Sequence, residues 1–386
     1  MVSFDNTANA FTAKSDAELN QSYWLFKLIG NPFLVKTGAI FAPLTLKLGF
    51  KGLIKKTIFK QFVGGENIND CSRTISALGK FNIGTILDYS VEGKESESDF
   101  EHCCKETIET IHRAKSDKNI PFCVFKVTGL ARFALLEKVS LCHSLASTEI
   151  DEWNRVETRV NNICSTAYES GVPLFIDAEE SWIQGAIDQL ADVNMARYNK
   201  ERAIVYNTYQ LYRHDRFAVL ISSFEKAKLK GYHIGAKLVR GAYMEKERLR
   251  AQEHNYPSPI QSSKEKTDED YNKALEFCIS NIDRFGICAG THNEKSSLKL
   301  VELLKQNNIS PTDHRVYFSQ LLGMSDHISY NLALAGYNVA KYVPYGPVNE
   351  VLPYLIRRAQ ENTSVKGQTG RELSLIIKEK KRRKAN

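Results

Sequence analysis

The sequence lacks the patterns that mark several large classes of protein. It has eight cysteines in 386 residues but no C-x-x-C pair. The adjacent His102, Cys103 and Cys104 have no second ligand pair at a spacing that zinc uses. We therefore expect no metal site and no disulfide framework, as in a reducing compartment.

Long apolar runs are also missing. The longest, Thr37 to Leu48, is interrupted by Gly38, Pro43 and Lys47, whereas a bilayer-spanning helix needs roughly 20 apolar residues. The first twenty residues have neither the apolar core of a signal peptide nor the arginines of a mitochondrial presequence. These absences predict a cytoplasmic protein, and peripheral contact with the inner membrane stays open.

The charge of the chain is uneven. The net charge is +7, and basic residues gather in two places. Five lysines and no acid occupy Lys47 to Lys60, and six basic residues with one Glu occupy Lys378 to Lys384. Such segments are equally typical of a solvated face and of weak attraction to an anionic membrane. With no basic-aromatic recognition module in the chain, we expect no binding to nucleic acid.

The rest of the chain alternates between short apolar runs and amphipathic stretches. Eight such runs are typical of buried strands: 83–90, 121–127, 172–177, 203–210, 234–240, 286–292, 315–320 and 337–343. Amphipathic stretches with helical spacing separate them, for example 153–170, 183–198, 217–230, 271–284 and 296–306. Apolar strands that alternate with helices indicate a parallel sheet covered by helices.

Eight strand–helix units favour an α/β fold with a closed (β/α)8 barrel of the TIM type. An open doubly wound sheet is the alternative, but no strand is followed by G-x-G-x-x-G. The chain is longer than the roughly 250 residues of one such barrel, so we expect three parts. These are a helical segment over 1–76, the catalytic barrel over 77–372 and a basic tail over 373–386. The polar stretch 244–270 is long for a loop and predicts either a mobile lid or a surface excursion.

In a β/α barrel the chemistry lies at the carboxyl ends of the strands. The last polar residues of the eight runs are Asp88, Lys126, Asp177, Gln210, Lys237 with Arg240, Thr291 with His292, Gln320 and Tyr342. A single Lys or Asp at such a position is unremarkable. A barrel would bring all eight positions to one mouth, which favours a functional site.

Three stretches indicate the chemistry. Leu238 to Tyr243 turns through a glycine, so backbone can lie close to a ligand. Thr291, His292 and Asn293 stand where the chain enters a helix, an end that receives phosphate. Arg357 and Arg358 lie on a helix after Pro353, and Glu361 can hold either one. Paired guanidinium groups suit a carboxylate, although an exposed salt-bridged helix gives the same pattern.

Five motifs, in this order, closely resemble the proline dehydrogenase family: AKLVRGAY, AGTHN, YFSQLLGM, KYVPYGP and YLIRRAQEN. The resemblance runs from about Phe62 to Arg371. It implies a monofunctional flavin enzyme on a distorted barrel, with the final helix over the mouth. The implied reaction oxidises L-proline to Δ1-pyrroline-5-carboxylate and passes electrons through FAD to a membrane quinone. A separate pyrroline-5-carboxylate dehydrogenase would be a transient partner.

The resemblance also implies roles for individual residues. Asp177, Lys237 and Lys126 would be catalytic. The substrate would be surrounded by Lys126, Leu322, Tyr342, Tyr354, Arg357 and Arg358. FAD would be held by Ala178, Gln210, Lys237, Val239, Arg240, Gly241, Ala242, Thr291, His292, Asn293 and Gln320, with Glu361 bracing the last helix. Many bacterial members have Arg where this chain has Lys237, which keeps a cation near the flavin but cannot bind bidentately.

Two other enzymes stay open. A Schiff-base aldolase with Lys126 as nucleophile would share the fold but need no flavin. Hydroxyproline dehydrogenase is a close relative of the same family. The bulky Tyr342 resembles the proline-specific enzymes, in which a tyrosine would crowd a 4-hydroxyl group.

Overall fold

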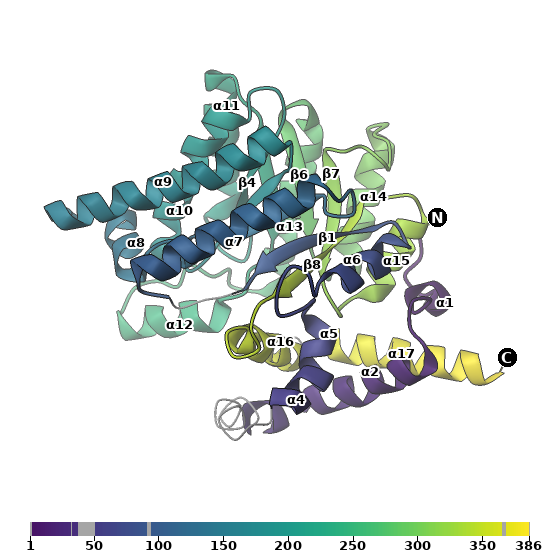
Figure 1. Cartoon of the computed structure of the whole chain (residues 1–386). Helices are drawn as coiled ribbons and strands as arrows, with labels where there is room; N and C mark the ends of the chain where they lie inside the picture. Colours follow the sequence, from purple (N-terminus) through teal and green to yellow (C-terminus); the bar gives the residue numbers. More distant parts are fainter. Residues whose placement is uncertain (1, 32, 38–50, 91–93, 365–367, 386) are drawn as a thin grey trace. The chain divides into compact units, whose positions relative to one another are not determined.

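The computed structural model describes residues 2–31, 33–37, 51–90, 94–364 and 368–385, without the side chains of residues 53, 360–364, 368 and 369. Eight parallel strands form a closed barrel and follow one another in chain order (Figure 1). They are β1 (Ile83–Tyr89), β2 (Phe122–Lys126), β3 (Leu174–Asp177), β4 (Val205–Gln210), β5 (Ile234–Val239), β6 (Phe285–Gly290), β7 (Val316–Leu321) and β8 (Val339–Tyr345). Each overlaps one of the eight apolar runs, so the predicted (β/α)8 barrel is confirmed.

The chain divides into two compact units. The central unit is Gly93–Ser319, and the terminal unit joins Met1–Glu92 to Gln320–Asn386. The central unit contains β2 to β6, and the terminal unit contains β1 and β8. The three-part division drawn from the sequence stays a prediction.

The helices of the central unit alternate with its strands along the chain. They are α7 (Glu97–Lys115), η2 (Val127–Gly129), α8 (Phe133–Ser140), α9 (Ser147–Ser170), α10 (Ser181–Tyr198), α11 (Arg216–Lys230), α12 (Met244–Glu253), α13 (Lys264–Ser280), η3 (Ile282–Arg284) and α14 (Glu294–Gln306). The side chains of Ser96, Ser263 and Asn293 cap α7, α13 and α14, which satisfies backbone N–H groups that a helix start leaves unpaired.

The strands of the central unit are buried along almost their whole length. All residues of β3 and β4 are buried, as are all of β5 but Val239. Burial on both faces explains why these strands show apolar runs instead of alternation. All eight cysteines lie among the described residues as thiols, and seven are buried, so the buried ones act as small apolar side chains.

The polar stretch 244–270 is not a loop throughout. It forms α12 and the first turns of α13, so the prediction of a long loop is wrong for these parts. Only Glu247 and Ala251 of α12 are buried. A helix with so small an apolar face gives no hydrophobic periodicity, and its sequence therefore resembles a loop.

The terminal unit is mainly helical outside its strands. Its helices are α1 (Thr7–Ala10), α2 (Asp16–Ile29), α4 (Lys51–Ile54), η1 (Lys55–Phe59, a π-helix), α5 (Lys60–Phe62), α6 (Ser72–Gly79), α15 (Asp326–Leu334), α16 (Leu352–Ser364) and α17 (Gln368–Ala385). Ser15 and Glu18 form a capping box at the start of α2. Most of the apolar run 37–48 lies outside the described residues.

The basic tail is a helix packed on another helix. In Figure 1, α17 lies beside α2, and the two are in contact. Leu375 and Ile376 of α17 are 1% exposed and share a core with Phe26 of α2. The acid within the basic run, Glu379, is fully buried and accepts hydrogen bonds from Arg382 and Arg383. The basic residues of the tail therefore belong to a packed helix, α17.

Candidate active site

The carboxyl ends of β2, β3 and β5 carry three charged side chains of the central unit. Lys126 and Asp177 end β2 and β3 and are partners in the strand register. The Lys237 Nζ of β5 lies 2.5 Å from the Asp177 Oδ1, and the two side chains are only 7% and 12% exposed. The same Nζ lies 5.2 Å from the centre of the Phe175 ring. Because little water screens this pair, its charges interact more strongly than they would at the surface.

The connection after Asp177 is fixed by hydrogen bonds to three other elements. The backbone N–H of Glu179 donates to the Gln184 Oε1 of α10 at 2.9 Å, and its carbonyl oxygen accepts from the Gln210 Nε2 of β4 at 2.7 Å. The Glu179 carboxyl group accepts from the backbone N of Thr128 at 3.0 Å and from its Oγ1 at 2.5 Å. Gln210 is thereby oriented at the end of its strand.

Glu179 is itself an unusual acid. It is 3% exposed, and burial raises its pKa to about 8, although hydrogen bonds from Thr128 oppose this shift. The charge of Glu180 raises the pKa further, and the charge of Lys126 lowers it. Near neutral pH the group is thus mostly uncharged, and it titrates in a range where ordinary carboxyl groups are fully ionised.

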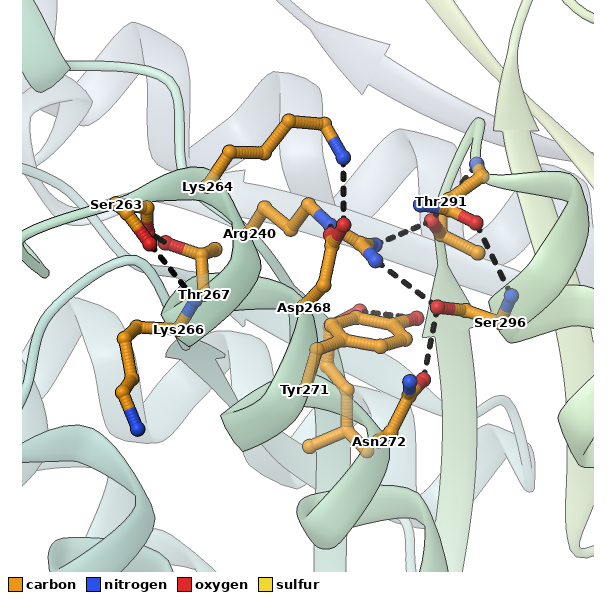
Figure 2. Close-up of polar contacts among 12 residues, drawn as sticks. Arg240, Ser263, Lys264, Lys266, Thr267, Asp268, Tyr271, Asn272, Thr291 and Ser296 are labelled. Carbon is orange, nitrogen blue, oxygen red and sulfur yellow. Dashed lines mark hydrogen bonds and ion pairs between the residues drawn. The ribbon is translucent and has the colours of Figure 1, made fainter.

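A second polar cluster surrounds Arg240, directly after β5 (Figure 2). The Nε donates to the Asp268 Oδ1 at 2.7 Å, one terminal nitrogen donates to the Thr291 Oγ1 at 2.7 Å, and the other donates to the Ser296 Oγ at 2.9 Å. The guanidinium carbon also lies 4.4 Å from the centre of the Tyr271 ring. One side chain therefore links the end of β5, α13 and the start of α14.

Asp268 is the anion of this cluster. Burial disfavours its charge, but hydrogen bonds and charges from Lys264 and Arg240 outweigh that effect and hold the pKa of Asp268 below its usual value. The Lys264 Nζ lies 2.5 Å from the Asp268 Oδ2. Asp268 is therefore ionised at neutral pH and fixes the orientation of Arg240.

The backbone beside Arg240 and the start of α14 are shaped for close approach. Gly241 has a φ of +136°, and a Cβ there would come within 2.4 Å of the Tyr212 ring, so only glycine fits. In Thr291-His292-Asn293, the Asn293 Oδ1 caps α14 by accepting from the Ser296 N at 3.1 Å, and the Thr291 Oγ1 accepts from the Asn293 N at 3.1 Å. The N-terminus of a helix favours an anionic ligand.

The terminal unit carries the remaining predicted residues. Tyr342 of β8, Tyr354 and Arg358 of α16 are 8%, 4% and 6% exposed, and the guanidinium carbon of Arg358 lies 5.0 Å from the centre of the Tyr354 ring. Arg357 is half-buried. The backbone N of Leu322 donates to the Tyr342 carbonyl at 2.9 Å. Glu361 belongs to α16, but its side chain lies outside the described residues.

Lys341, which precedes Tyr342, positions the chain around Leu322. Lys341 is wholly buried. Its Nζ lies 2.9 Å from the Asp326 Oδ1 and donates to the Met324 carbonyl at 2.5 Å. Gln320, another predicted residue, is buried and accepts from the Ser329 Oγ at 2.8 Å. These contacts hold the turn after β7 in one conformation.

The structure thus brings together several subsets of the predicted residues. Lys126, Asp177, Ala178, Gln210 and Lys237 lie at neighbouring strand ends of the central unit. Val239, Arg240, Gly241 and Ala242 continue from β5, and Arg240 binds Thr291, which adjoins His292 and Asn293. In the terminal unit, Leu322 adjoins Tyr342, and Tyr354 adjoins Arg358.

Sequence analysis missed three residues that organise these subsets, Thr128, Glu179 and Asp268, and it also missed Glu247, which accepts hydrogen bonds from Ser181 at the start of α10. Glu179 and Thr128 had a usable signal, because each stands two residues after a predicted site residue, Asp177 or Lys126. Asp268 and Glu247 lie in the stretch taken for a loop. Only the fold shows their partners.

Comparison with known proteins agrees with this geometry. Residues 71–371 match the family model described as proline dehydrogenase. Proline dehydrogenase 1, mitochondrial, of Dictyostelium discoideum is 34% identical over 98% of this chain and 74% of its own length. Hydroxyproline dehydrogenase of Xenopus laevis is 30% identical over 97% of this chain and 89% of its own. In fold, the chain resembles proline utilization A of Bdellovibrio bacteriovorus, with a TM-score of 0.74 and 19% identity over 93% of this chain and 38% of that one.

The chain belongs to the proline dehydrogenase family. It is therefore an oxidoreductase, and the family resemblance noted in the five motifs is confirmed. Proline dehydrogenases are flavoenzymes in general, and their substrate class is proline. An aldolase using Lys126 has no support from any of these relatives. Within the described residues, no helix combines the length and apolarity needed to cross a bilayer.

Proposed function

We propose that this protein oxidises L-proline to Δ1-pyrroline-5-carboxylate with FAD as the hydride acceptor. The observation that carries the proposal is the buried pair of Lys237 and Asp177 with Lys126 beside it in register. These are the three residues for which the family motifs imply catalysis. The reaction turns the C–N bond of the ring into a C=N bond, as a hydride leaves carbon and a proton leaves nitrogen.

The residues of the central unit fit a flavin dinucleotide. Arg240, Thr291 and the capped start of α14 supply donors for a diphosphate, and Gly241 lets backbone approach without a side chain. The buried cation Lys237 suits the negative charge of a reduced flavin ring. FAD would supply the two-electron acceptor, because no protein side chain accepts a hydride. We propose that Ala178, Gln210, Val239, Ala242, His292, Asn293 and Gln320 contribute the remaining contacts, and that Glu361 braces α16.

On the substrate side, we propose that Arg357 and Arg358 bind the carboxylate, since a guanidinium pairs with it in planar geometry. Leu322, Tyr342 and Tyr354 would enclose the ring. Lys126 and the arginines would disfavour a protonated substrate amine by charge repulsion. The amine must lose this proton before a hydride can leave the adjacent carbon.

Hydroxyproline is the competing substrate, because one relative is named a hydroxyproline dehydrogenase. Tyr342 favours proline, since its phenol is bulky and nearly buried at 8% exposure. Rates on L-proline and on trans-4-hydroxy-L-proline decide between the two. A faster reaction with the hydroxylated ring would replace proline as the proposed substrate.

A quinone dissolved in lipid is the proposed final electron acceptor, reached by peripheral contact with a membrane. Support comes from α2, where Trp24 and Leu28 are each 53% exposed, and from Phe33 beyond it, which is 74% exposed. The Lys27 Nζ lies 5.0 Å from the Trp24 ring. Apolar side chains mixed with lysines suit an interface with anionic lipid. The cytoplasmic location and a separate pyrroline-5-carboxylate dehydrogenase as partner also stay proposals, and the Dictyostelium relative is named mitochondrial.

One spectroscopic experiment tests the proposed reaction. The purified protein should show flavin absorbance, and adding L-proline without oxygen should bleach it. Acid precipitation should release the yellow colour into the supernatant, because the proposed contacts are non-covalent. A colourless protein that cannot be loaded with FAD, or a spectrum unchanged by proline, would overturn the proposal.

A further inference from the structure

Two short connections of the central unit are tied together immediately beyond their functional residues. Lys126 and Asp177 are register partners at the ends of β2 and β3. Two residues further along each chain segment, Thr128 and Glu179 meet through two hydrogen bonds, at 3.0 and 2.5 Å. The link is buried, since Glu179 is 3% exposed. The position of Lys126 is therefore coupled to Glu179 through both backbone and charge.

The electrostatic surroundings of Glu179 come from few groups. Lys126 on the β2 side favours its ionised form, and Glu180 on its own connection disfavours it. The ammonium group of Lys246, on α12, pairs with Glu180. Gln184 and Gln210, the other partners of residue 179, are neutral and contact its backbone. Lys126 is thus the cation that responds most directly to the charge state of Glu179.

We propose that Glu179 is a positioning residue that regulates, through its protonation, how strongly Lys126 attracts an anionic substrate. With Glu179 neutral, the positive charge of Lys126 is available to a carboxylate ligand. With Glu179 ionised, part of that charge is matched within the protein. This inference rests on the proposed function, because it takes Lys126 as a residue that faces the substrate.

The direction of the pH effect follows from linkage. The pKa of Glu179 is about 8 without ligand, and a nearby ligand carboxylate would raise it further by like-charge repulsion. The neutral form of Glu179 therefore binds the anion more tightly. Affinity should be highest below about pH 8 and should fall as pH rises through that value. At pH values near the pKa of Glu179 without ligand and the higher pKa with ligand, binding of the anion should be accompanied by proton uptake.

The test needs a ligand that does not titrate itself. (S)-Tetrahydrofuran-2-carboxylate carries a ring oxygen in place of the amine of proline. Its carboxylate is its only titrating group, so it keeps a single negative charge between about pH 6.5 and 9.5. Its dissociation constant for the flavin-loaded protein can be followed by the flavin spectrum. Proton uptake comes from calorimetry in buffers of different ionisation enthalpy. We expect the dissociation constant to rise about tenfold from the acidic to the alkaline limit for each unit by which the pKa moves, with net proton uptake near pH 8.

Glu179→Gln is the decisive variant. A glutamine can accept from the Thr128 N and donate to the Thr128 Oγ1, so the geometry survives while the ionisation is lost. We expect unchanged flavin content and thermal stability, no proton uptake on binding, and affinity that no longer falls through pH 8. A structural role alone would not remove proton uptake from a folded variant.

Glu180→Gln serves as the matched control, because it removes an acid of equal burial one residue away. It should keep the proton uptake, with the transition moved to lower pH, since Glu180 raises the pKa of Glu179. The same uptake in Glu179→Gln as in the unchanged protein, or none in either, overturns the inference. Bleaching of the flavin by proline in the unchanged protein separates that outcome from failure of the proposed function.

Discussion

The connections that follow β3 and β5 are fixed in different ways. The first, residues 178–180, is short and is held by buried groups: the Glu179 carboxyl, its backbone N–H and its carbonyl oxygen all have partners. The second, residues 240–263, is anchored near its two ends by the contacts of Arg240 and by backbone hydrogen bonds of Pro259 and Gln261, whereas α12 within it forms ion pairs with other helices, such as Lys246 with Glu180 and Arg250 with Glu137. Both connections belong to the central unit.

The difference matters because burial decides what a polar contact contributes. A buried charge or hydrogen-bonding group that loses its partner costs several kcal/mol, whereas an exposed ion pair contributes about 0 to 1 kcal/mol. The connection that follows Asp177 should therefore be rigid. The connection that contains α12 should open with little loss of overall stability. The helix α12 also has a buried contact. Glu247 is fully buried and accepts hydrogen bonds from the backbone N and the Oγ of Ser181 at 2.7 and 2.6 Å.

The largest effect is expected from Lys237→Met, which removes the cation of β5 that pairs with Asp177 at the end of β3. The variant takes away the ammonium group that lies 2.5 Å from the nearly buried Asp177 carboxylate. We expect the free energy of unfolding to fall by about 3 to 5 kcal/mol, measured by urea unfolding of proteins freed of flavin.

Lys226→Met provides the control for that change. Its Nζ lies 2.7 Å from the Asp192 Oδ2, but its side chain is 45% exposed, so its removal should cost less than about 1 kcal/mol. If the two variants lose the same free energy of unfolding, burial of the Lys237–Asp177 pair does not make it more stabilising than an exposed pair.

The sequence predicted the strands better than the connection that contains α12. Eight apolar runs gave all eight strands, because strands buried on both faces carry a strong local signal. Lys126, Asp177 and Lys237 follow from those strand ends. The helix α12 was not predicted from the sequence. It is held by Lys246, Glu247 and Arg250, and no local sequence pattern marks a polar side chain whose partner is distant in sequence.

The same limit applies to Arg240 and Glu179. Sequence analysis named Arg240 and missed Glu179, and a guanidinium shared among Asp268, Thr291 and Ser296 requires three elements in contact. The raised pKa of Glu179 depends on burial that only the fold produces. Prediction from sequence named side chains at the strand ends and missed buried and polar groups that surround them.

An intermediate effect is expected from Glu247→Ala, the buried tie of α12. The N-cap residue of α10, Glu180, makes no side-chain cap hydrogen bond, so Glu247 supplies the acceptor for the first turn. Its loss should lower the free energy of unfolding by about 1 to 2 kcal/mol. Glu247→Gln keeps one acceptor oxygen and should lose less. If alanine and glutamine cost nothing measurable in urea unfolding, Glu247 does not anchor α12.

The smallest effect on global stability is expected from Lys246→Ala. The ammonium group of Lys246 pairs with Glu180; the Lys246 side chain is 59% exposed and the Glu180 side chain 6% exposed, so water and salt reach the pair from the lysine side only. We expect the free energy of unfolding to fall by about 1 kcal/mol, the upper end of the range for an exposed pair. Local opening should respond more than the global value, because so little apolar surface holds α12 in place.

Limited proteolysis distinguishes local from global opening in this last variant. Cleavage within 244–263 should be faster in Lys246→Ala at low salt, and raised salt should bring the unchanged protein toward the rate of the variant, since salt weakens the same ion pair. Cleavage elsewhere should keep its rate, because the connection after β3 has buried ties of its own. Equal acceleration across the central unit would instead show that the two connections open together, and the contrast between them would fail.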